Sequence, residues 1–284
     1  MKERYNYVNK EGKLIYGDRC FDGIYVLKNG VAVVEKNDKS NYINKEGKFL
    51  SEDWFDYVHD FIDGFGLVEL NGKYNYINEK GKFISKNWFD YAYDFMDGLG
   101  SVELNGKWNN INEKGEYISK DWFDAAWDFE DGFAVVKKGD KYNYINKEGK
   151  YISEKWFDCA ENFKNGFGRV YMKNKWNYIN QNGEYISGKW FERADDFREG
   201  FAKVRVNKKF NFINKKGEYI SKDWFYYAFA FENGVAFVKN EGKYNIINQN
   251  GEYISKVWFN DWRVDNGSIK IKLNGEWKYL DKSK

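Results

Sequence analysis

Proline is absent from this chain of 284 residues. Average usage would place roughly 14 prolines in a chain of this length, so its turns must depend on glycine, asparagine and aspartate. Cysteine is scarce as well, because only Cys20 and Cys159 occur, which is too few for a disulfide framework and unlike any metal-binding spacing. We expect both to be small packing residues in a reducing, cytoplasmic compartment.

Histidine occurs once, at His59. Histidine is the side chain that most often transfers protons in catalysis, and the chain also lacks a glycine-rich phosphate loop. We interpret His59 as a substitution at a variable surface position. The repeated Asp-x-x-Asp-Gly segments lack the alternating ligands of a calcium loop and are interpreted as turns. The sequence therefore predicts no enzymatic activity, no cofactor and no metal site.

Neither charge nor a long apolar run dominates the chain. Lysine and arginine total 46, aspartate and glutamate total 44, and the two signs alternate along the sequence, which disfavours nucleic-acid binding driven by bulk charge. No 18-residue apolar stretch predicts a membrane span, and the first 13 residues lack the apolar core of a signal peptide. We expect a soluble cytoplasmic protein, and the lysine-, asparagine- and isoleucine-rich composition hints at a bacterial or phage source.

Aromatic residues make up 21% of the chain and recur at regular intervals. They belong to eight tandem copies of a unit of about 34 residues, which together predict a single repeat domain over residues 1–284, with 278–284 as a partial unit or closing strand. The copies begin at Asn6, Asn41, Asn75, Asn109, Asn143, Asn177, Asn211 and Asn245.

Two turn signals appear in the repeats. A glycine follows polar residues between two apolar runs, as at Gly47 and Gly81, and Asn-Gly pairs occur at Asn71 and Asn105. Both patterns predict tight hairpins with positive φ angles. The intervening runs are rich in β-branched and aromatic residues, and a small residue two positions before a valine predicts one buried strand face. These features predict an all-β fold.

One segment of each unit, Trp-Phe-Asp-x-Ala-x-Asp-Phe, fits two conformations. Trp122, Ala126 and Phe129 would line one side of a short helix, whereas an extended strand would place Phe123, Ala125, Trp127 and Phe129 on one face. We favour the strand, because the rest of the unit is β and a helix of this length would be short.

The whole pattern, an aromatic-Asn-Tyr-Ile-Asn segment, a glycine three residues later and then Phe-Asp-x-Ala-x-x-Phe-x-x-Gly-x-Ala-x-Val, resembles the WG repeats of bacterial proteins. The departure lies in the name-giving dipeptide, which reads Trp108-Asn109 or Tyr142-Asn143 in this chain. Asparagine tolerates a left-handed backbone better than other non-glycine residues, so we expect a similar backbone there. The resemblance implies a β-repeat fold and little about activity.

A single unit cannot bury its own aromatic face, so neighbouring units must stack. We predict a propeller-like closed toroid in which the C-terminal hairpin completes the sheet of the first unit. An open β-solenoid or a superhelical arc is the alternative, because four strands are tightly accommodated in 34 residues and the end copies are atypical.

Constant and variable positions separate within the repeat. The Trp-Phe pairs, such as Trp54 with its neighbour, are constant and expected in the core, whereas the second and fourth positions after that phenylalanine change from copy to copy. We expect function on this variable stripe, or on the atypical end copies, rather than in the motif that names the family. Its candidate partner-binding residues are Tyr57, His59, Tyr91, Tyr93, Trp127, Arg193, Tyr227 and Phe229.

These residues favour a non-catalytic scaffold that binds another protein, as an adaptor or as an inhibitor that covers its partner. Carbohydrate or cell-wall binding is one alternative, because tyrosine and tryptophan rings stack on sugars. Binding of single-stranded nucleic acid by base stacking is another, which the near-neutral charge disfavours.

Overall fold

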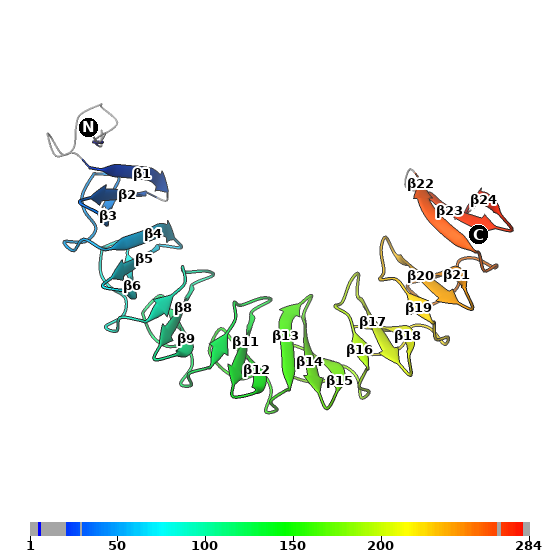
Figure 1. The fold of residues 1–284 in the computed structure, drawn as a ribbon. Coiled ribbons are helices and arrows are strands. Elements are labelled where there is room, and N and C mark those ends of the chain that lie inside the picture. The colour runs from blue at the N-terminus through cyan, green and yellow to red at the C-terminus, as the bar shows by residue number, and fades with distance from the viewer. Residues whose placement is uncertain (1–4, 7–20, 29, 266–267, 281–284) are drawn as a thin grey trace. The chain divides into compact units, whose positions relative to one another are not determined.

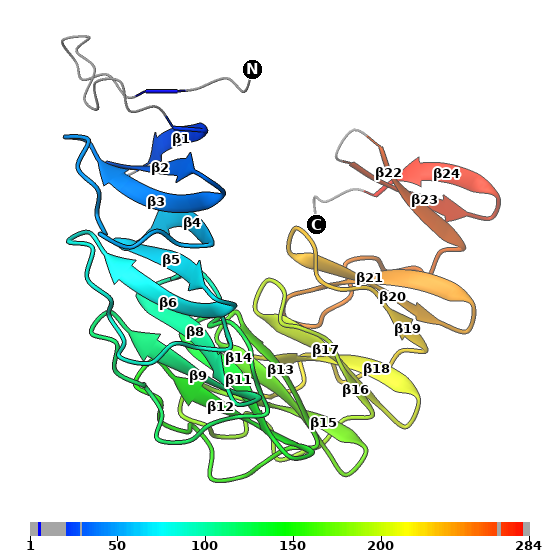
Figure 2. The same cartoon turned by 60° about the vertical axis from the view of Figure 1, so that its left-hand side comes forward.

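The computed structural model describes residues 5–6, 21–28, 30–265 and 268–280 (Figure 1). These residues form strands and turns, and no helix occurs among them. They build eight antiparallel sheets, each of three strands that are consecutive in the chain (Figure 2). The all-β prediction is confirmed.

The chain divides into two compact units, residues 1–128 with 148–150 and residues 129–147 with 151–284. The first unit contains β1 (Gly23–Lys28), β2 (Val31–Lys36), β3 (Lys39–Asn44), β4 (Tyr57–Ile62), β5 (Phe65–Leu70), β6 (Lys73–Asn78), β7 (Tyr91–Ala92), β8 (Leu99–Leu104), β9 (Lys107–Asn112) and β10 (Ala125–Ala126).

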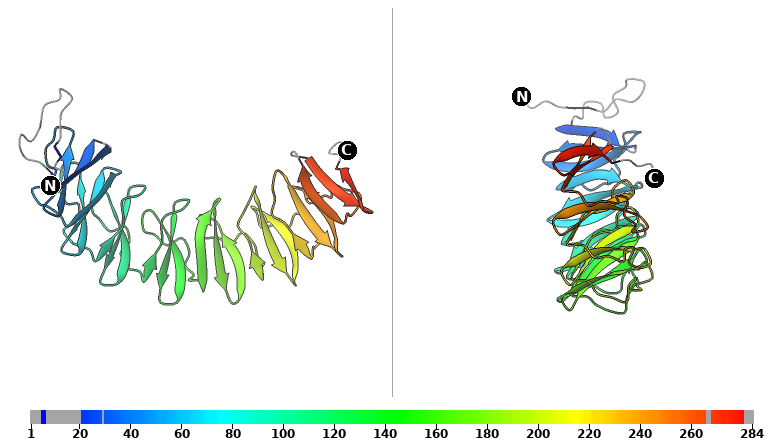
Figure 3. Two further views of the ribbon diagram at one scale, coloured as in Figure 1. Left: turned by 45° about the horizontal axis from the view of Figure 1, so that its top comes forward. Right: turned by 90° about the vertical axis from the view of Figure 1, so that its right-hand side faces the viewer.

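The second unit continues the same pattern, with colour changing steadily from strand to strand (Figure 3). It contains β11 (Phe133–Lys138), β12 (Lys141–Asn146), β13 (Cys159–Lys164), β14 (Phe167–Met172), β15 (Lys175–Ile179), β16 (Arg193–Ala194), β17 (Phe201–Val206), β18 (Lys209–Asn214), β19 (Tyr227–Ala228), β20 (Val235–Asn240), β21 (Lys243–Asn248), β22 (Asp261–Asp265), β23 (Ser268–Leu273) and β24 (Glu276–Tyr279).

Two-residue turns join the strands of the second sheet. Asp63 and Gly64 connect β4 to β5 with φ angles of 51° and 84°, and Asn71 and Gly72 connect β5 to β6 with φ angles of 53° and 70°. Two successive positive φ angles define the turn whose twist matches that of the flanking strands. The predicted Asn-Gly hairpins are confirmed.

The third turn reverses the chain at the end of the third strand, before the chain continues to the next sheet. Gly81 has a φ of +70°, and a Cβ atom placed on it would lie 1.4 Å from the carbonyl oxygen of Leu50 in the preceding repeat. Only glycine permits both this conformation and this approach. The predicted turn is confirmed, and its glycine also lets successive repeats stack closely.

After this turn the chain returns along the third strand of the same sheet. Phe83 pairs with Ile77 and Phe89 pairs with Tyr74, after which the chain continues into β7. The Trp-Phe-Asp segment is therefore extended, as favoured, rather than helical. The expected common face of Phe123 and Trp127 is wrong, because the chain bends at Asp124 and leaves Phe123 fully buried while Trp127 is 41% exposed.

Successive sheets bury a shared core. Leu67 and Tyr76 of the second sheet pack against Ala92, Val102 and Ile111 of the third. The valine that follows the small residue is fully buried, as predicted. In the Trp-Phe pair the prediction holds for the phenylalanine alone, which is fully buried, whereas the tryptophan is only partly buried and stacks edge-on against an aromatic residue of the return segment.

The asparagines that replace the glycine of the WG dipeptide act through their side chains. Asn211 is fully buried, its amide donates to the carbonyl oxygens of Ser221 at 2.9 Å and Asp223 at 3.2 Å, and its side-chain oxygen accepts from the Phe212 backbone amide at 2.7 Å. It is not among the residues with positive φ. The expectation of a left-handed backbone here is wrong, because Asn211 lies in the regular strand β18 and ties it to the return segment.

The C-terminal hairpin β23–β24 pairs with β22 in an eighth sheet of its own. The predicted use of this hairpin to complete the first sheet is therefore not confirmed, and closure of the repeats into a ring stays a prediction. Residues 281–284 of the expected closing segment, Gly12 and Cys20 lie outside the described residues.

Candidate partner-binding face

One face of each sheet presents three residues side by side, one from each strand. In the second sheet Tyr57 pairs with Glu69, which pairs with Tyr74. We call such a set a face triplet, and its middle residue lies on the second strand. The member on the third strand directly precedes the buried asparagine of its repeat, as Tyr74 precedes Asn75. Cross-strand neighbours of this kind lie about 4.5–5.5 Å apart at their Cβ atoms, so their side chains interact.

The face triplets of the second and third sheets contribute Tyr74, Tyr91 and Trp108 to an aromatic run that Tyr93 completes. The Tyr74 and Tyr91 ring centroids are 5.3 Å apart, those of Tyr91 and Tyr93 are 5.1 Å apart, and Tyr93 stacks on Trp108 at 5.6 Å. Tyr91 is 41% and Tyr93 is 53% exposed. The run therefore joins two sheets across their exposed rim.

Buried tyrosines of the preceding sheet hold this stripe in place. The Tyr76 hydroxyl lies 2.5 Å from the carbonyl oxygen of Tyr93, and the Tyr42 hydroxyl lies 2.6 Å from that of His59. The second of these bonds meets β4 at an irregularity in its pairing, which occurs between Val58 and Phe61. Such a bulge re-aims the side chains on either side of it. The exposed stripe therefore stands on a fixed backbone.

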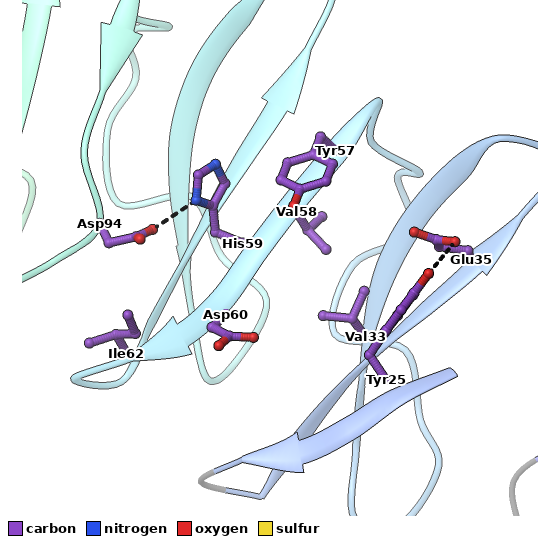
Figure 4. A pocket seen from close by; sticks show the side chains of 9 residues that line it. All are labelled: Tyr25, Val33, Glu35, Tyr57, Val58, His59, Asp60, Ile62 and Asp94. Atoms are coloured by element: carbon purple, nitrogen blue, oxygen red, sulfur yellow. Dashed lines mark hydrogen bonds and ion pairs between the residues drawn. The ribbon is translucent and has the colours of Figure 1, made fainter. Parts of the chain in front are cut away.

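A hollow of about 520 Å³ lies beside Tyr57 and His59 in the first unit (Figure 4). Its polar groups come from several strands: His59 Nδ1 lies 3.2 Å from an Asp94 oxygen, and the Tyr25 hydroxyl donates to Glu35 at 3.0 Å. The remaining lining residues are Val33, Val58, Asp60 and Ile62.

Neighbouring carboxylates set the electrostatics of this hollow. The hydrogen bond to Asp94 raises the pKa of His59 above its usual value, against the opposing effect of partial burial. The hydrogen bond to Glu35 likewise raises the pKa of Tyr25. The hollow thus offers carboxylates, phenol groups and one imidazole, a set that suits binding of polar or cationic groups.

Basic residues take the place of the carboxylates in several face triplets of the second unit. The Lys239 ammonium lies 4.5 Å from the centre of the Tyr244 ring, and the Lys137 ammonium lies 5.6 Å from that of Tyr142. Such cation–π contacts are attractive through the electron-rich ring face. The second unit therefore covers these rings with its own cations.

The sequence pattern of a protein family described as "WG containing repeat" matches six successive stretches that together exceed half of the chain. They are residues 42–74, 76–108, 111–142, 144–176, 178–210 and 212–244. The chain belongs to the WG-repeat family. The sequence resemblance is confirmed, and the structure adds an equivalent sheet on either side of the matched stretches.

Comparison with curated proteins gave no sequence match. Among solved structures, the chain resembles Kluyveromyces lactis Hsv2 at 13% identity, with 75% of this chain and 86% of that chain covered and a TM-score of 0.34. It resembles apo AztD from Citrobacter koseri at 12% identity, with 89% and 85% covered and a TM-score of 0.35. At these TM-scores the fold of the WG repeats rests on the strands and sheets described above.

The predicted stripe residues of the WG repeats divide between the two units. Tyr57, His59, Tyr91, Tyr93 and Trp127 belong to the first unit, and Arg193, Tyr227 and Phe229 belong to the second. Tyr57 and His59 form one ring pair at 5.2 Å, Tyr91 and Tyr93 form another, and Tyr227 and Phe229 form a third at 5.0 Å.

Arg193, like His59, is paired with a carboxylate. Its Nε atom lies 2.9 Å from Asp195, and hydrogen bonds to Arg193 together with nearby Lys203 lower the pKa of Asp195 despite the opposing burial. Tyr227 and Phe229 continue instead into an aromatic group, since Phe229 lies 5.6 Å from Trp262. The stripe therefore has a different chemistry in each unit.

Sequence reasoning missed the residues that complete the surface, namely Tyr74, Trp108, Glu69 and Glu103. Tyr74 and Trp108 stand at the position of the tryptophan in the WG dipeptide, so the motif that names the family lies on the candidate surface. The expectation that function lies on the stripe rather than in this motif stays a prediction, although the two share one surface. These residues could have been found by following the pairing of the three strands through both hairpin turns, because this register places each of them beside a stripe residue.

The described part of the chain holds no group of three or more histidine, cysteine, aspartate or glutamate residues arranged to bind a metal ion. A helix able to cross a membrane is likewise missing from these residues. Cys159, at the first position of the stripe in its repeat, is half-buried, and this burial raises the pKa of its thiol.

Proposed function

We propose that these WG repeats form a non-catalytic cytoplasmic scaffold that binds another protein through the aromatic run of the first unit. The observation that carries the proposal is the clustering of exposed Tyr91 and Tyr93 with Tyr74 and Trp108 on hydrogen-bonded sheets. Tyrosine and tryptophan supply much of the binding energy at protein interfaces, at a low cost in conformational entropy. Such a scaffold acts as an adaptor, or as an inhibitor that covers its partner.

The surroundings of the run favour a protein over the other ligands that aromatic residues can bind. Glu69 and Glu103 lie between the rings in the face triplets, and their charge repels the phosphates of a nucleic acid. Tyr93 stacks on one face of the Trp108 ring with an interplanar angle of 23°, so a sugar would have only the opposite face of this ring to stack on. A protein surface can instead contact the ring edges, the hydroxyl groups and the carboxylates together.

Site-specific photo-crosslinking tests the proposal. Benzoylphenylalanine replaces Tyr91 in one variant and Phe83 in a matched control, because Phe83 is an aromatic residue of the same unit with a similar exposure of 36%. We expect the Tyr91 variant to form one dominant adduct with a partner protein in cells of the source organism. Equal adduct patterns from the two positions, or no adduct from either, would contradict the proposal.

Ring closure is a separate proposal about the same repeats. A compact chain of 284 residues has a radius of gyration of about 19 Å, which is the value that a closed toroid approaches. An open solenoid or arc gives a larger value. Small-angle X-ray scattering of the monomer separates the two arrangements.

A further inference from the structure

The two units treat the same aromatic position in opposite ways. In the second unit the middle residue of the face triplet is often basic, and its cation lies over the ring of the third strand. Lys239 lies 4.5 Å from the centre of the Tyr244 ring, and these residues are direct cross-strand partners. The same arrangement recurs in Lys137 over Tyr142 at 5.6 Å and Lys272 over Trp277 at 5.9 Å.

In the first unit the middle residue of the triplet is glutamate in all three complete sheets. Glu35, Glu69 and Glu103 stand where Lys137, Lys239 and Lys272 stand in the second unit. The described part of the chain places no lysine or arginine over the rings of Tyr74 and Trp108. Each of these rings instead has a carboxylate beside it.

An aromatic ring and a neighbouring carboxylate attract a cation through two separate interactions. The ring face attracts it through its quadrupole, and the carboxylate attracts it through charge and a hydrogen bond. Tyr74 shows that the two groups interact, because partial burial and then the charge and hydrogen bond of Glu69 raise its pKa. The second unit shows that this sheet geometry seats a cation on the ring.

We propose that the Glu69–Tyr74 and Glu103–Trp108 pairs bind a lysine- or arginine-bearing segment of the partner protein. This inference rests on the proposed function and adds the chemical class of the partner. Tyr74 and Trp108 both lie within 6.2 Å of Tyr91, measured between ring centroids, so four residues of an extended peptide, about 13 Å long, reach both pairs. Arginine suits the site best, because its planar group stacks on rings and pairs with carboxylates through two hydrogen bonds.

Charge around the two pairs supports a cationic segment. Glu35 and Asp94 line the adjoining hollow, and His59 is the one basic residue among the side chains that line it. A second copy of this chain is a poorer occupant through its own face triplets, because Lys137, Lys239 and Lys272 already lie over rings of their own sheets. Anionic partners would face Glu69 and Glu103 directly.

Fluorescence anisotropy at about 150 mM salt tests the inference with labelled hexa-arginine and labelled hexa-glutamate. We expect the full chain to bind hexa-arginine and not hexa-glutamate. The double variant E69Q/E103Q should bind hexa-arginine at least tenfold more weakly. The Trp108→Leu variant should also weaken binding, which a purely electrostatic attraction would not show.

A matched control removes two carboxylates from the other end of the same sheets. Glu79 and Glu113 are exposed and lie near the turns at Gly64 and Gly98, away from the face triplets. The E79Q/E113Q variant carries the same change in net charge and should bind hexa-arginine within twofold of the parent chain. Equal losses from the two double variants, or no loss from Trp108→Leu, would overturn the inference.

Two further measurements separate this inference from the function on which it rests. If the crosslink from position 91 persists in the E69Q/E103Q variant, the protein-binding function stands and the cationic segment is refuted. If the crosslink is lost in E69Q/E103Q and kept in E79Q/E113Q, both are supported. Sedimentation velocity that shows a dimer disrupted only by E69Q/E103Q would assign the surface to a second copy instead and overturn the inference.

Discussion

Replacement of the buried Asn211 by glycine should destabilise this protein, although glycine is the residue that the WG dipeptide carries at this position. Asn211 forms three hydrogen bonds and has no exposed surface. Glycine would remove all three and leave the Phe212 amide and the two carbonyl oxygens without these partners. A buried polar group without a partner costs about 1–3 kcal/mol, so we expect a loss of about 3 kcal/mol.

The comparison with alanine makes the prediction discriminating. If Asn211 served to hold a left-handed backbone, glycine would be tolerated and alanine would cost about 1–2 kcal/mol. If the hydrogen bonds are decisive, alanine loses them too, and glycine is the worse of the two by roughly 0.5–1 kcal/mol because it adds backbone entropy to the unfolded chain. The order of stability therefore reverses between the two explanations.

Asn207 provides the control in the same sheet. It lies in the turn between β17 and β18 with a φ of 48°, so Asn207→Gly should leave stability unchanged or raise it slightly. Hydrogen exchange of the β18 amides, followed by mass spectrometry, measures the local effect, because repeat proteins lose stability mainly in the altered unit and its neighbours. An Asn211→Gly variant as protected as the parent and more protected than Asn211→Ala would refute the reasoning.

Two further predictions follow from the geometry. Because His59 is the only histidine, its NMR titration should give a pKa above about 6.5, and this pKa should fall in the Asp94→Asn variant. The raised pKa in the folded protein means that the His59–Asp94 contact adds stability below about pH 6.5, and that this stability is lost as the pH rises through the folded pKa. An unchanged His59 pKa in the variant would contradict the contact. In urea unfolding, Gly217→Ala should reduce the free energy of unfolding by at least about 2 kcal/mol more than Gly242→Ala. Both glycines have positive φ, but only at Gly217 would the new Cβ meet a carbonyl oxygen, that of Ile186 at 2.0 Å. Equal losses of stability would show that this close approach is unimportant.

Local turn chemistry was the most predictable part of this protein. The Asn71-Gly72 hairpin and the Gly81 turn follow from two to four adjacent residues whose φ preferences leave few alternatives. The repeat adds the same evidence several times over. The fold class could therefore be derived from the sequence alone, as could the extended form of the Trp-Phe-Asp segment.

The candidate site was only half predictable, because it depends on which residues meet across strands and sheets. The variable stripe identified Tyr91 and Tyr93, but Trp108 reaches them only through two hairpin turns and the register between β8 and β9. His59 and Asp94 are 35 positions apart and meet only when two sheets stack. The role of the buried asparagines was misjudged for a related reason, since their partners lie ten and twelve residues away in the return segment.

The face triplets show where this architecture leaves chemistry free to change. The residue before the middle position, such as Val68 or Val238, is a fully buried valine in seven of the eight sheets, and the eighth has the buried Ile271 there, since this residue fills the core between sheets. The middle residue itself points to the opposite face of its strand, so its charge can reverse without disturbing that core. Glu69 and Lys239 hold equivalent places in equivalent sheets, and packing does not require either sign. The difference in charge between the two units is therefore a difference in what their surfaces can bind, which is why the first test of partner chemistry belongs at Glu69 and Glu103.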